Sequence, residues 1–383
     1  MVHPNTKLLR SIGMMVGAIV GVGVFGLPYA FSQSGIGIGF LWLIVIWTTL
    51  LILQLMLAEV AVQTPGKDRL VGFVHRYIGP KWRLITLIAL ASGIWGAMLA
   101  YMIIGGRFLH ILLEPTLGGS EMLYSIIVWV ISSYMIHRGL QSAAKLEVVV
   151  VAILLFLFLF ISLLSIPSIN PANYLTINLE NVFVPYGVIL FSLAGMGIVP
   201  EMADVLGKRK KQDLARSVVI AMSIILAIYV FFALAVIGVT GNATTQAAFD
   251  GLIPVFGNGF RLISTILGTV TVLSIFMVLG IELQNTFKFD FKLKHRSAWF
   301  FTIIVPLILL LSGVTEFISL IGFVGGVFGG FLGILVALTY WNMKRSAVCK
   351  QHHCIDFPHV FTWAIIAMFS GGIIYQLASV FLT

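Results

Sequence analysis

Long apolar runs alternate with short polar connections along almost the whole chain. The runs are close to the roughly 20 residues that a helix needs to cross a bilayer, and the ten-residue alternation of a membrane β-barrel is absent. The pattern predicts an all-α integral membrane protein with eleven transmembrane helices, at about 9–32, 38–62, 84–113, 122–136, 146–166, 182–204, 214–240, 260–286, 298–313, 316–341 and 360–382.

Composition supports this prediction and also affects how the positive net charge is interpreted. Of the 383 residues, 60% are hydrophobic and 10% are charged, and the mean hydropathy is +1.07, which excludes an ordinary soluble domain. A net charge of +9 would suit a nucleic-acid partner, but the basic residues lie almost entirely in the connections, so we exclude that role. With the N-terminus cytoplasmic and the C-terminus outside, only Arg107 and Arg261 face outward, and we expect the plasma (inner) membrane.

Two predicted spans carry helix-breaking sequences at matching places. The first has glycines at 17, 21, 23 and 26 followed by Pro28, and the sixth has Gly195 and Gly197 followed by Pro200. Glycine and proline both weaken a helix, so helices 1 and 6 are predicted to be discontinuous, with 21–25 unwound near the bilayer midplane.

The two interruptions open two blocks of five spans. Because five is odd, the second block crosses the membrane in the opposite sense, which is the inverted-repeat arrangement of secondary transporters. This predicts a first five-helix repeat at 1–168, a second, inverted repeat at 178–342, and a cytoplasmic loop with an eleventh helix at 343–383. The connection from Gly241 to Gly259 is expected to form an outer lid.

A broken membrane helix leaves N–H groups on one side of the break and carbonyls on the other. Helix N-termini attract anions and C-termini attract cations, so paired breaks fit a zwitterion. The alternative is that these glycines are only close-packing surfaces. We expect the substrate carboxylate at the N–H groups around Gly23, Val24 and Phe25, with Val22 beside them, and the ammonium at carbonyls near Val20, Gly21, Phe191 and Ala194, with Gly195 in the second break.

Four side chains are candidates for the walls of a substrate side-chain pocket, namely Trp95, Tyr101, Phe191 and Met196. Apolar walls favour a neutral substrate with a hydrophobic or aromatic side chain, because a buried charge would need a partner. The alternative for each of the four is ordinary packing within the helix bundle.

Several motifs carry a family resemblance: SIGMMVGAIVGVGVFGLPYAF in the first span, E-x-x-x-x-T-P-G from Glu59, AYMIIGG in the third span and FSLAGMGIVPEMADVLG in the sixth. Together they resemble the amino acid/auxin permease branch of the amino acid, polyamine and organocation transporters. The resemblance implies a LeuT-like fold and amino acid transport by alternating access, coupled to H⁺ or Na⁺. In sodium-coupled relatives an ion lies between first-span carbonyls and eighth-span hydroxyls, which here are Thr271 and Ser274.

Acidic residues within or beside the spans are candidates for coupling or gating. Glu59, Asp204 and Glu282 lie toward the predicted cytoplasmic ends, and with Arg10 they are assigned to an inner gate. Glu201, directly after Pro200, is the candidate for a proton relay, and the alternative for it, as for the other acids, is a gate or a structural ion pair.

The cluster Cys349-Lys-Gln-His352-His353-Cys354 is predicted to be a polar cytoplasmic loop with reduced cysteines and without a resident metal. A channel would need a filter-like segment and an intramembrane enzyme would need a catalytic motif, and the sequence has neither. We therefore expect a secondary active symporter of amino acids without enzymatic chemistry or organic cofactor, whose partners are the amino acid, its coupling ion and the bilayer. The alternatives are a transporter-like amino acid sensor and a transporter of another small amine or organic cation.

Overall fold

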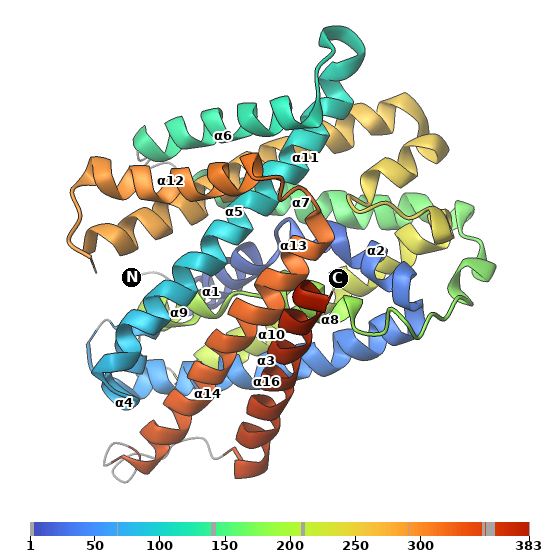
Figure 1. Cartoon of the computed structure of the whole chain (residues 1–383). Coiled ribbons are helices and arrows are strands. Elements are labelled where there is room, and N and C mark those ends of the chain that lie inside the picture. Colours follow the sequence, from blue (N-terminus) through green and yellow to red (C-terminus); the bar gives the residue numbers. More distant parts are fainter. Residues whose placement is uncertain are drawn as a thin grey trace.

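The computed structural model describes residues 4–66, 68–138, 143–207, 211–289, 291–346, 349 and 357–382, and the regular elements of these residues are all helices (Figure 1). The longer ones are α1 (Pro4–Ile19), α2 (Gly23–Ser34), α3 (Ile36–Gln63), α4 (Leu70–Tyr77), α5 (Pro80–Leu117), α6 (Glu121–Arg138), α7 (Ala143–Ser165), α8 (Val184–Ser192), α9 (Val199–Leu206), α10 (Lys211–Thr240), α11 (Phe249–Phe289), α12 (His295–Leu311), α13 (Phe317–Phe323), α14 (Gly330–Arg345) and α16 (His359–Leu382). Short 3₁₀ turns are η1 (Ile166–Ser168), η2 (Pro171–Tyr174), η3 (Met196–Ile198) and η4 (Gly241–Ala243), and η5 (Val324–Gly329) is a π-helix that joins α13 to α14.

Each predicted apolar run is helical, but not every helix meets the criteria for a span. Among the described residues, seven helices are long and apolar enough to cross a membrane, or eight if the bent pair α1 and α2 counts as one span. Two further apolar helices, at 152–168 and 295–311, are shorter than that. The all-helical membrane fold is confirmed, whereas the count of eleven spans and the boundaries of the two repeats stay predictions.

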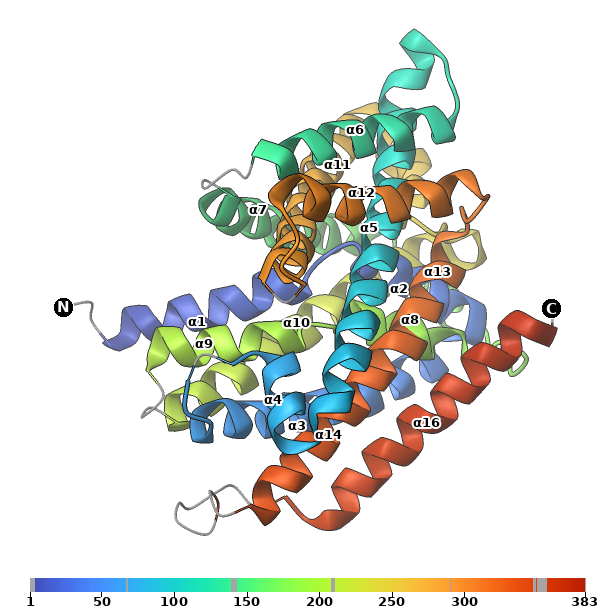
Figure 2. The same cartoon turned by 60° about the vertical axis from the view of Figure 1, so that its left-hand side comes forward.

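The interrupted helices occupy the middle of the bundle. Figures 1 and 2 show α6 and α12 on one side of the molecule, α3 and α16 on the other, and α1, α2, α8 and α9 between them. The helices α1 and α2 are bent by 57° relative to each other. Contacts join α1 to α10, α2 to α8 and α3 to α9, so the two breaks are enclosed by neighbouring helices. This arrangement keeps the exposed backbone of the breaks away from lipid.

Glycine allows α8 to approach the π-helix closely. A Cβ atom on Gly325 would lie 2.5 Å from the backbone nitrogen of Phe191, and one on Gly187 would overlap the backbone of Gly322. The break at the end of α8 therefore rests on a backbone-to-backbone contact, and π-helical turns of this kind are frequent at functional sites.

Candidate functional site

The first break lies at Val20–Val22, between α1 and α2. Gly21 within it has no Cβ, and one placed there would overlap the Tyr101 hydroxyl, which accepts a hydrogen bond of 3.1 Å from the Val22 N–H. The expectation that 21–25 is unwound is wrong for its second half, because α2 already begins at Gly23. The reason is that the Val24 and Phe25 N–H groups close the first turn, donating to the carbonyls of Gly21 (3.4 Å) and Val22 (3.1 Å).

The second break follows α8, which ends at Ser192 and is followed by η3 and then α9. The Ala194 N–H turns back to the Phe191 carbonyl at 3.2 Å, so that predicted ammonium ligand already accepts one hydrogen bond. A carbonyl oxygen has two lone pairs and keeps room for a second donor.

The two breaks contact each other directly. A Cβ on Gly23 would lie 2.7 Å from the Ser192 Cα, and a Cβ on Gly195 would overlap the Ile19 side chain. Close packing by glycine, the alternative interpretation, is therefore also true of Gly23 and Gly195. The same glycines that end the helices let the start of α2 meet the end of α8, which brings N–H groups and carbonyls of opposite polarity together.

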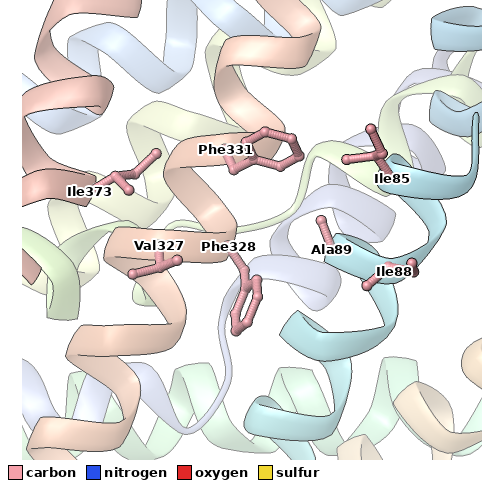
Figure 3. Close-up of a pocket in the computed structure, with 7 residues that line it drawn as sticks. All are labelled: Ile85, Ile88, Ala89, Val327, Phe328, Phe331 and Ile373. Atoms are coloured by element: carbon pink, nitrogen blue, oxygen red, sulfur yellow. The ribbon is translucent and has the colours of Figure 1, made fainter. Parts of the chain in front are cut away.

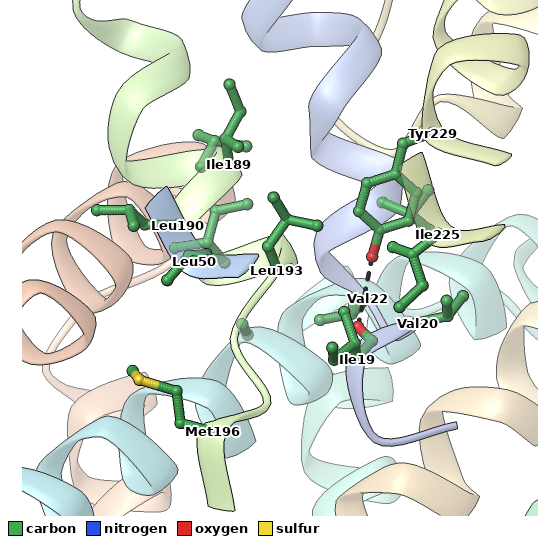
Figure 4. Packing of buried hydrophobic residues seen from close by; sticks show 14 of the residues in the cluster. Ile19, Val20, Val22, Leu50, Ile189, Leu190, Leu193, Met196, Ile225 and Tyr229 are labelled. Carbon is green, nitrogen blue, oxygen red and sulfur yellow. Dashed lines mark hydrogen bonds between the residues drawn. The ribbon is translucent and has the colours of Figure 1, made fainter. Parts of the chain in front are cut away.

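A tyrosine from α10, which sequence reasoning did not assign, lies between the two helix ends. The fully buried Tyr229 donates its hydroxyl proton to the Ser192 carbonyl at 2.7 Å and lies 3.4 Å from the Ile19 carbonyl, the contact drawn in Figure 4. It is the only tyrosine of α10, and its place in the middle of an apolar helix is the signal that could have drawn attention to it.

The proposed side-chain pocket is only partly assembled. Tyr101 reaches the first break, and the Phe191 ring lies 3.0 Å from the Cβ position of Gly23. Trp95 instead donates its indole N–H to the Phe301 carbonyl of α12 at 3.2 Å. The Met196 side chain points away from Tyr229 (Figure 4).

The two hydroxyls proposed for ion coupling differ in their hydrogen bonds. Thr271 donates to the Leu267 carbonyl of its own helix at 2.8 Å, as hydroxyls in membrane helices commonly do. Ser274 is buried, and its hydroxyl has no hydrogen-bond partner among the described residues. Its neighbour Ile275 comes within 3.8 Å of the Cβ position of Gly21, so this part of α11 lies beside the first break.

Ion pairs join the helices at the end of the bundle that carries α4 and α9. Arg69 lies 3.0 Å from Asp204 and 4.0 Å from Glu201. Lys211 lies 2.8 Å from Glu59, whose carboxylate is completely buried and also accepts from Gln63. The basic partners Arg69 and Lys211 were not predicted, because which cation meets which acid depends on how the helices pack.

The remaining members of the proposed inner gate, Arg10 and Glu282, lie in different surroundings. Arg10 is exposed, whereas a Glu282 oxygen lies 3.7 Å from the Cβ position of Gly197, beside the second break. Glu201, the proposed proton relay, has a half-exposed side chain.

The opposite end of the bundle is closed by an aromatic cluster (Phe25, Phe108, Phe158, Phe232 and Phe249). Its rings meet at centroid distances between 4.7 and 6.5 Å, mostly edge to face or tilted. Phe249 belongs to the predicted lid and follows Ala248, which has a φ of +54°, a left-handed conformation that is costly for a residue with a side chain.

A charged pair lies beside the aromatic cluster. Arg107 of α5 hydrogen-bonds the carboxylate of Asp250, whose side chain is only 13% exposed. The break region is therefore covered from the lid side by packed rings and a paired charge.

The apolar surface pockets do not lie at the two helix breaks. One of about 280 Å³ is lined by Ile85, Ile88, Ala89, Val327, Phe328, Phe331 and Ile373 (Figure 3). It contains none of the predicted site residues.

The cysteine cluster differs from expectation. Cys349 is disulfide-bonded, so the prediction of reduced cysteines is wrong for this residue. The prediction used only the redox poise of the cytoplasm, which says nothing about local geometry. His352, His353 and Cys354 lie outside the described residues, and no metal-binding group of His, Cys, Asp and Glu is found within the described ones.

The sequence profile of the tryptophan/tyrosine permease family matches residues 5–376, almost the whole chain. The chain belongs to this family. The assignment to the amino acid/auxin permease branch is therefore wrong. The glycines and proline of the first span reflect what a broken helix needs and do not distinguish one branch of such transporters from another.

Two relatives of this permease are transporters. It is 24% identical over 364 residues to the tyrosine-specific transport system 1 of Haemophilus influenzae, covering 89% of each chain. It is 22% identical over 371 residues to glutamine transporter 2 of Aliivibrio fischeri, covering 94% of each. The permease is therefore an integral membrane transporter of amino acids and not an enzyme.

Solved structures establish the fold of the permease. It matches MhsT in complex with L-phenylalanine with a TM-score of 0.71, 15% identity and coverage of 97% and 98% of the two chains. It matches the inward-facing conformation of Mhp1 with a TM-score of 0.70, 13% identity and coverage of 97% and 88%. The expected LeuT-like fold is confirmed.

Proposed function

We propose that the permease carries a neutral aromatic amino acid across the inner membrane by alternating access, and that it binds the zwitterionic part of the substrate between the two helix breaks. The observation that carries this proposal is the direct contact of the start of α2 with the end of α8, at Gly23 and Ser192. It brings one helix N-terminus and two helix C-termini together, and the residues at these three ends, Gly23, Ile19 and Ser192, have no ionisable side chain.

The carboxylate half of the site is formed by the start of α2. The Val22 N–H faces the Tyr101 hydroxyl, and the Gly23 N–H takes part in none of the turn or cap bonds of the described backbone. A carboxylate here would accept from these N–H groups and from the phenol, and charge-assisted hydrogen bonds of this kind are the stronger ones.

The ammonium half is formed by the last carbonyls of α1 and α8. The carbonyls of Ile19 and Ser192 converge on one hydroxyl, within 3.4 and 2.7 Å of it. An ammonium group has three N–H donors and can satisfy both carbonyls, with the Phe191 carbonyl as a further acceptor.

An aromatic substrate fits both the names of the relatives and the walls of the site. The family is named for tryptophan and tyrosine, one relative for tyrosine, and the MhsT structure holds L-phenylalanine. The other relative is a glutamine transporter, so a small neutral amide substrate is the competing candidate. Phe191 beside the breaks supports an aromatic side chain, since ring pairs add to simple burial.

Coupling to an ion is proposed through α11 rather than through Glu201. The buried hydroxyl of Ser274 has no partner among the described residues, and the next residue, Ile275, comes within 3.8 Å of the Cβ position of Gly21, which suits a Na⁺ ion held by oxygen atoms. Glu201 is half exposed and next to Arg69, an environment that favours a gate ion pair over a buried proton relay.

Counterflow uptake in proteoliposomes tests the function. Vesicles loaded with each of several unlabelled amino acids receive traces of the labelled form, and we expect accumulation for tyrosine, tryptophan or phenylalanine but not for arginine or glutamate. Accumulation of glutamine alone would favour the competing substrate, and accumulation of none, beside an active control permease, would refute the proposal. A Na⁺ gradient is expected to drive uptake, and Ser274→Ala is expected to abolish that dependence; uptake driven by a pH gradient alone would overturn the sodium assignment.

A further inference from the structure

Tyr229 is the only side chain of the described residues whose polar atom bonds the last carbonyl of both α1 and α8. Its ring is fully buried and comes from α10, a helix that packs against both α1 and α2. The hydroxyl donates to Ser192 at 2.7 Å and has Ile19 as a second, longer acceptor at 3.4 Å. One proton thus serves two acceptors on two different broken helices.

Electrostatics explain why these two carbonyls need a common donor. The end of a helix carries a partial negative charge, about half an elementary charge, on its last carbonyls. Two such ends that face each other in a buried region repel, and an unsatisfied buried carbonyl is costly. A phenol fixed between them holds the ends at a constant separation.

The polarity of the two tyrosines at the site also differs in a useful way. Tyr101 of α5 accepts from an N–H of the first break, and Tyr229 of α10 donates to carbonyls of both breaks. The Tyr101 hydroxyl thus acts as an acceptor, as a substrate carboxylate would, and the Tyr229 hydroxyl acts as a donor, as a substrate ammonium would.

We propose that Tyr229 is the positioning residue of the ammonium half of the site, a role that rests on the proposed function. Its hydroxyl keeps the Ile19 and Ser192 carbonyls directed at one point, and thereby makes binding depend on the amine of the ligand. Tyr229 then determines specificity for amine-bearing substrates, separately from the carboxylate half at Tyr101 and from the side-chain pocket.

The test compares three ligands that differ in one group each: L-phenylalanine, phenethylamine without the carboxylate, and 3-phenylpropionate without the amine. Binding to the purified full-length permease is measured for the native protein, Tyr229→Phe and the matched control Tyr186→Phe. Tyr186 is equally buried, and its hydroxyl has no partner among the described residues. Its phenylalanine variant is expected to bind all three ligands as the native protein does.

For Tyr229→Phe we expect the Kd of L-phenylalanine and of phenethylamine to rise about tenfold, the upper range for one neutral hydrogen bond, and that of 3-phenylpropionate to change less than about twofold. Tyr101→Phe is expected to show the converse, with the acid weakened and the amine unchanged. An equal loss for all three ligands in Tyr229→Phe would mean a general packing role, and no change for any would mean no role; either result overturns the inference.

Failure of the proposed function is recognised separately. If the native permease binds none of the three ligands, the proposed site is wrong and the inference falls with it, whereas binding that Tyr229→Phe leaves intact refutes the inference alone. If Tyr229→Phe does not fold, 3-fluorotyrosine placed at position 229 keeps the hydroxyl and reports by fluorine NMR. Its resonance is expected to shift with the amine and not with the acid, and equal shifts would contradict the role.

Discussion

Gly23→Ala tests the contact between the two breaks with a single methyl group. The added Cβ would lie 2.6 Å from the Ser192 hydroxyl oxygen, 2.7 Å from the Ser192 Cα and 3.0 Å from the Phe191 ring. Ordinary carbon contacts need about 3.5 Å or more, so the start of α2 and the end of α8 must separate by roughly 0.8 Å. The hydroxyl can rotate away, but the Cα is backbone and cannot.

The size of the effect follows from this enforced separation. Inserting one methyl into a packed region typically costs about 1–3 kcal/mol, and each 1.4 kcal/mol corresponds to a tenfold change in affinity. If the substrate bridges the two breaks, its Kd should rise between about fivefold and about 150-fold, and counterflow should fall accordingly.

The matched control is Gly13→Ala in α1, the first half of the same bent span. Gly13 is exposed, and no atom lies within 4 Å of its Cβ position. Alanine is also favoured over glycine in a helix by about 1 kcal/mol, so this variant should be at least as stable as the native protein and transport normally. Normal binding by Gly23→Ala, with a folded and monodisperse protein, would refute the reasoning that the breaks must touch.

Three further outcomes follow from the same contacts. Phe249→Ala removes the lid ring from the aromatic cluster, and because losing a buried phenylalanine costs about 3–5 kcal/mol, it should lower the melting temperature and speed the labelling of cysteines introduced below the ring. The control is Phe231→Ala, since Phe231 is 61% exposed, and equal labelling of both variants would contradict the closure. Gly325→Ala should prevent α8 from packing on the π-helix and reduce folded yield, while Gly322→Ala, with no atom within 4 Å, should not; similar yields would argue against the backbone contact. Glu59→Gln removes the buried carboxylate that pairs with Lys211, whose side chain is 27% exposed, and should cost about 1.5–3 kcal/mol in a thermal unfolding assay. An unchanged melting temperature would show that the pair contributes little.

Composition and local pattern were sufficient for the membrane class and for the place of the breaks. Glycine and proline act on the backbone of their own segment, so the interruption between Ile19 and Gly23 could be located from the residues alone. Its limits could not, because α2 starts as soon as the Val24 and Phe25 N–H groups find acceptors one turn back.

Contacts between segments far apart in the chain could not be predicted from the sequence. Arg107 was predicted only to face outward, and nothing in the sequence indicated that it would pair with Asp250 of the lid, 143 residues away. Tyr229 depends in the same way on how α10 packs against both breaks. Such pairings follow from the packed bundle and not from any local periodicity, and the family assignment failed for a related reason, since its strongest motif encodes only the break.

The most direct test of the substrate site between the two helix breaks is a structure of the permease with bound L-tyrosine. The site described here predicts the carboxylate within about 3 Å of the Val22 and Gly23 N–H groups and the ammonium within a similar distance of the Ile19 and Ser192 carbonyls. A ligand bound away from both breaks, or a first span that forms one continuous helix in the complex, would contradict it.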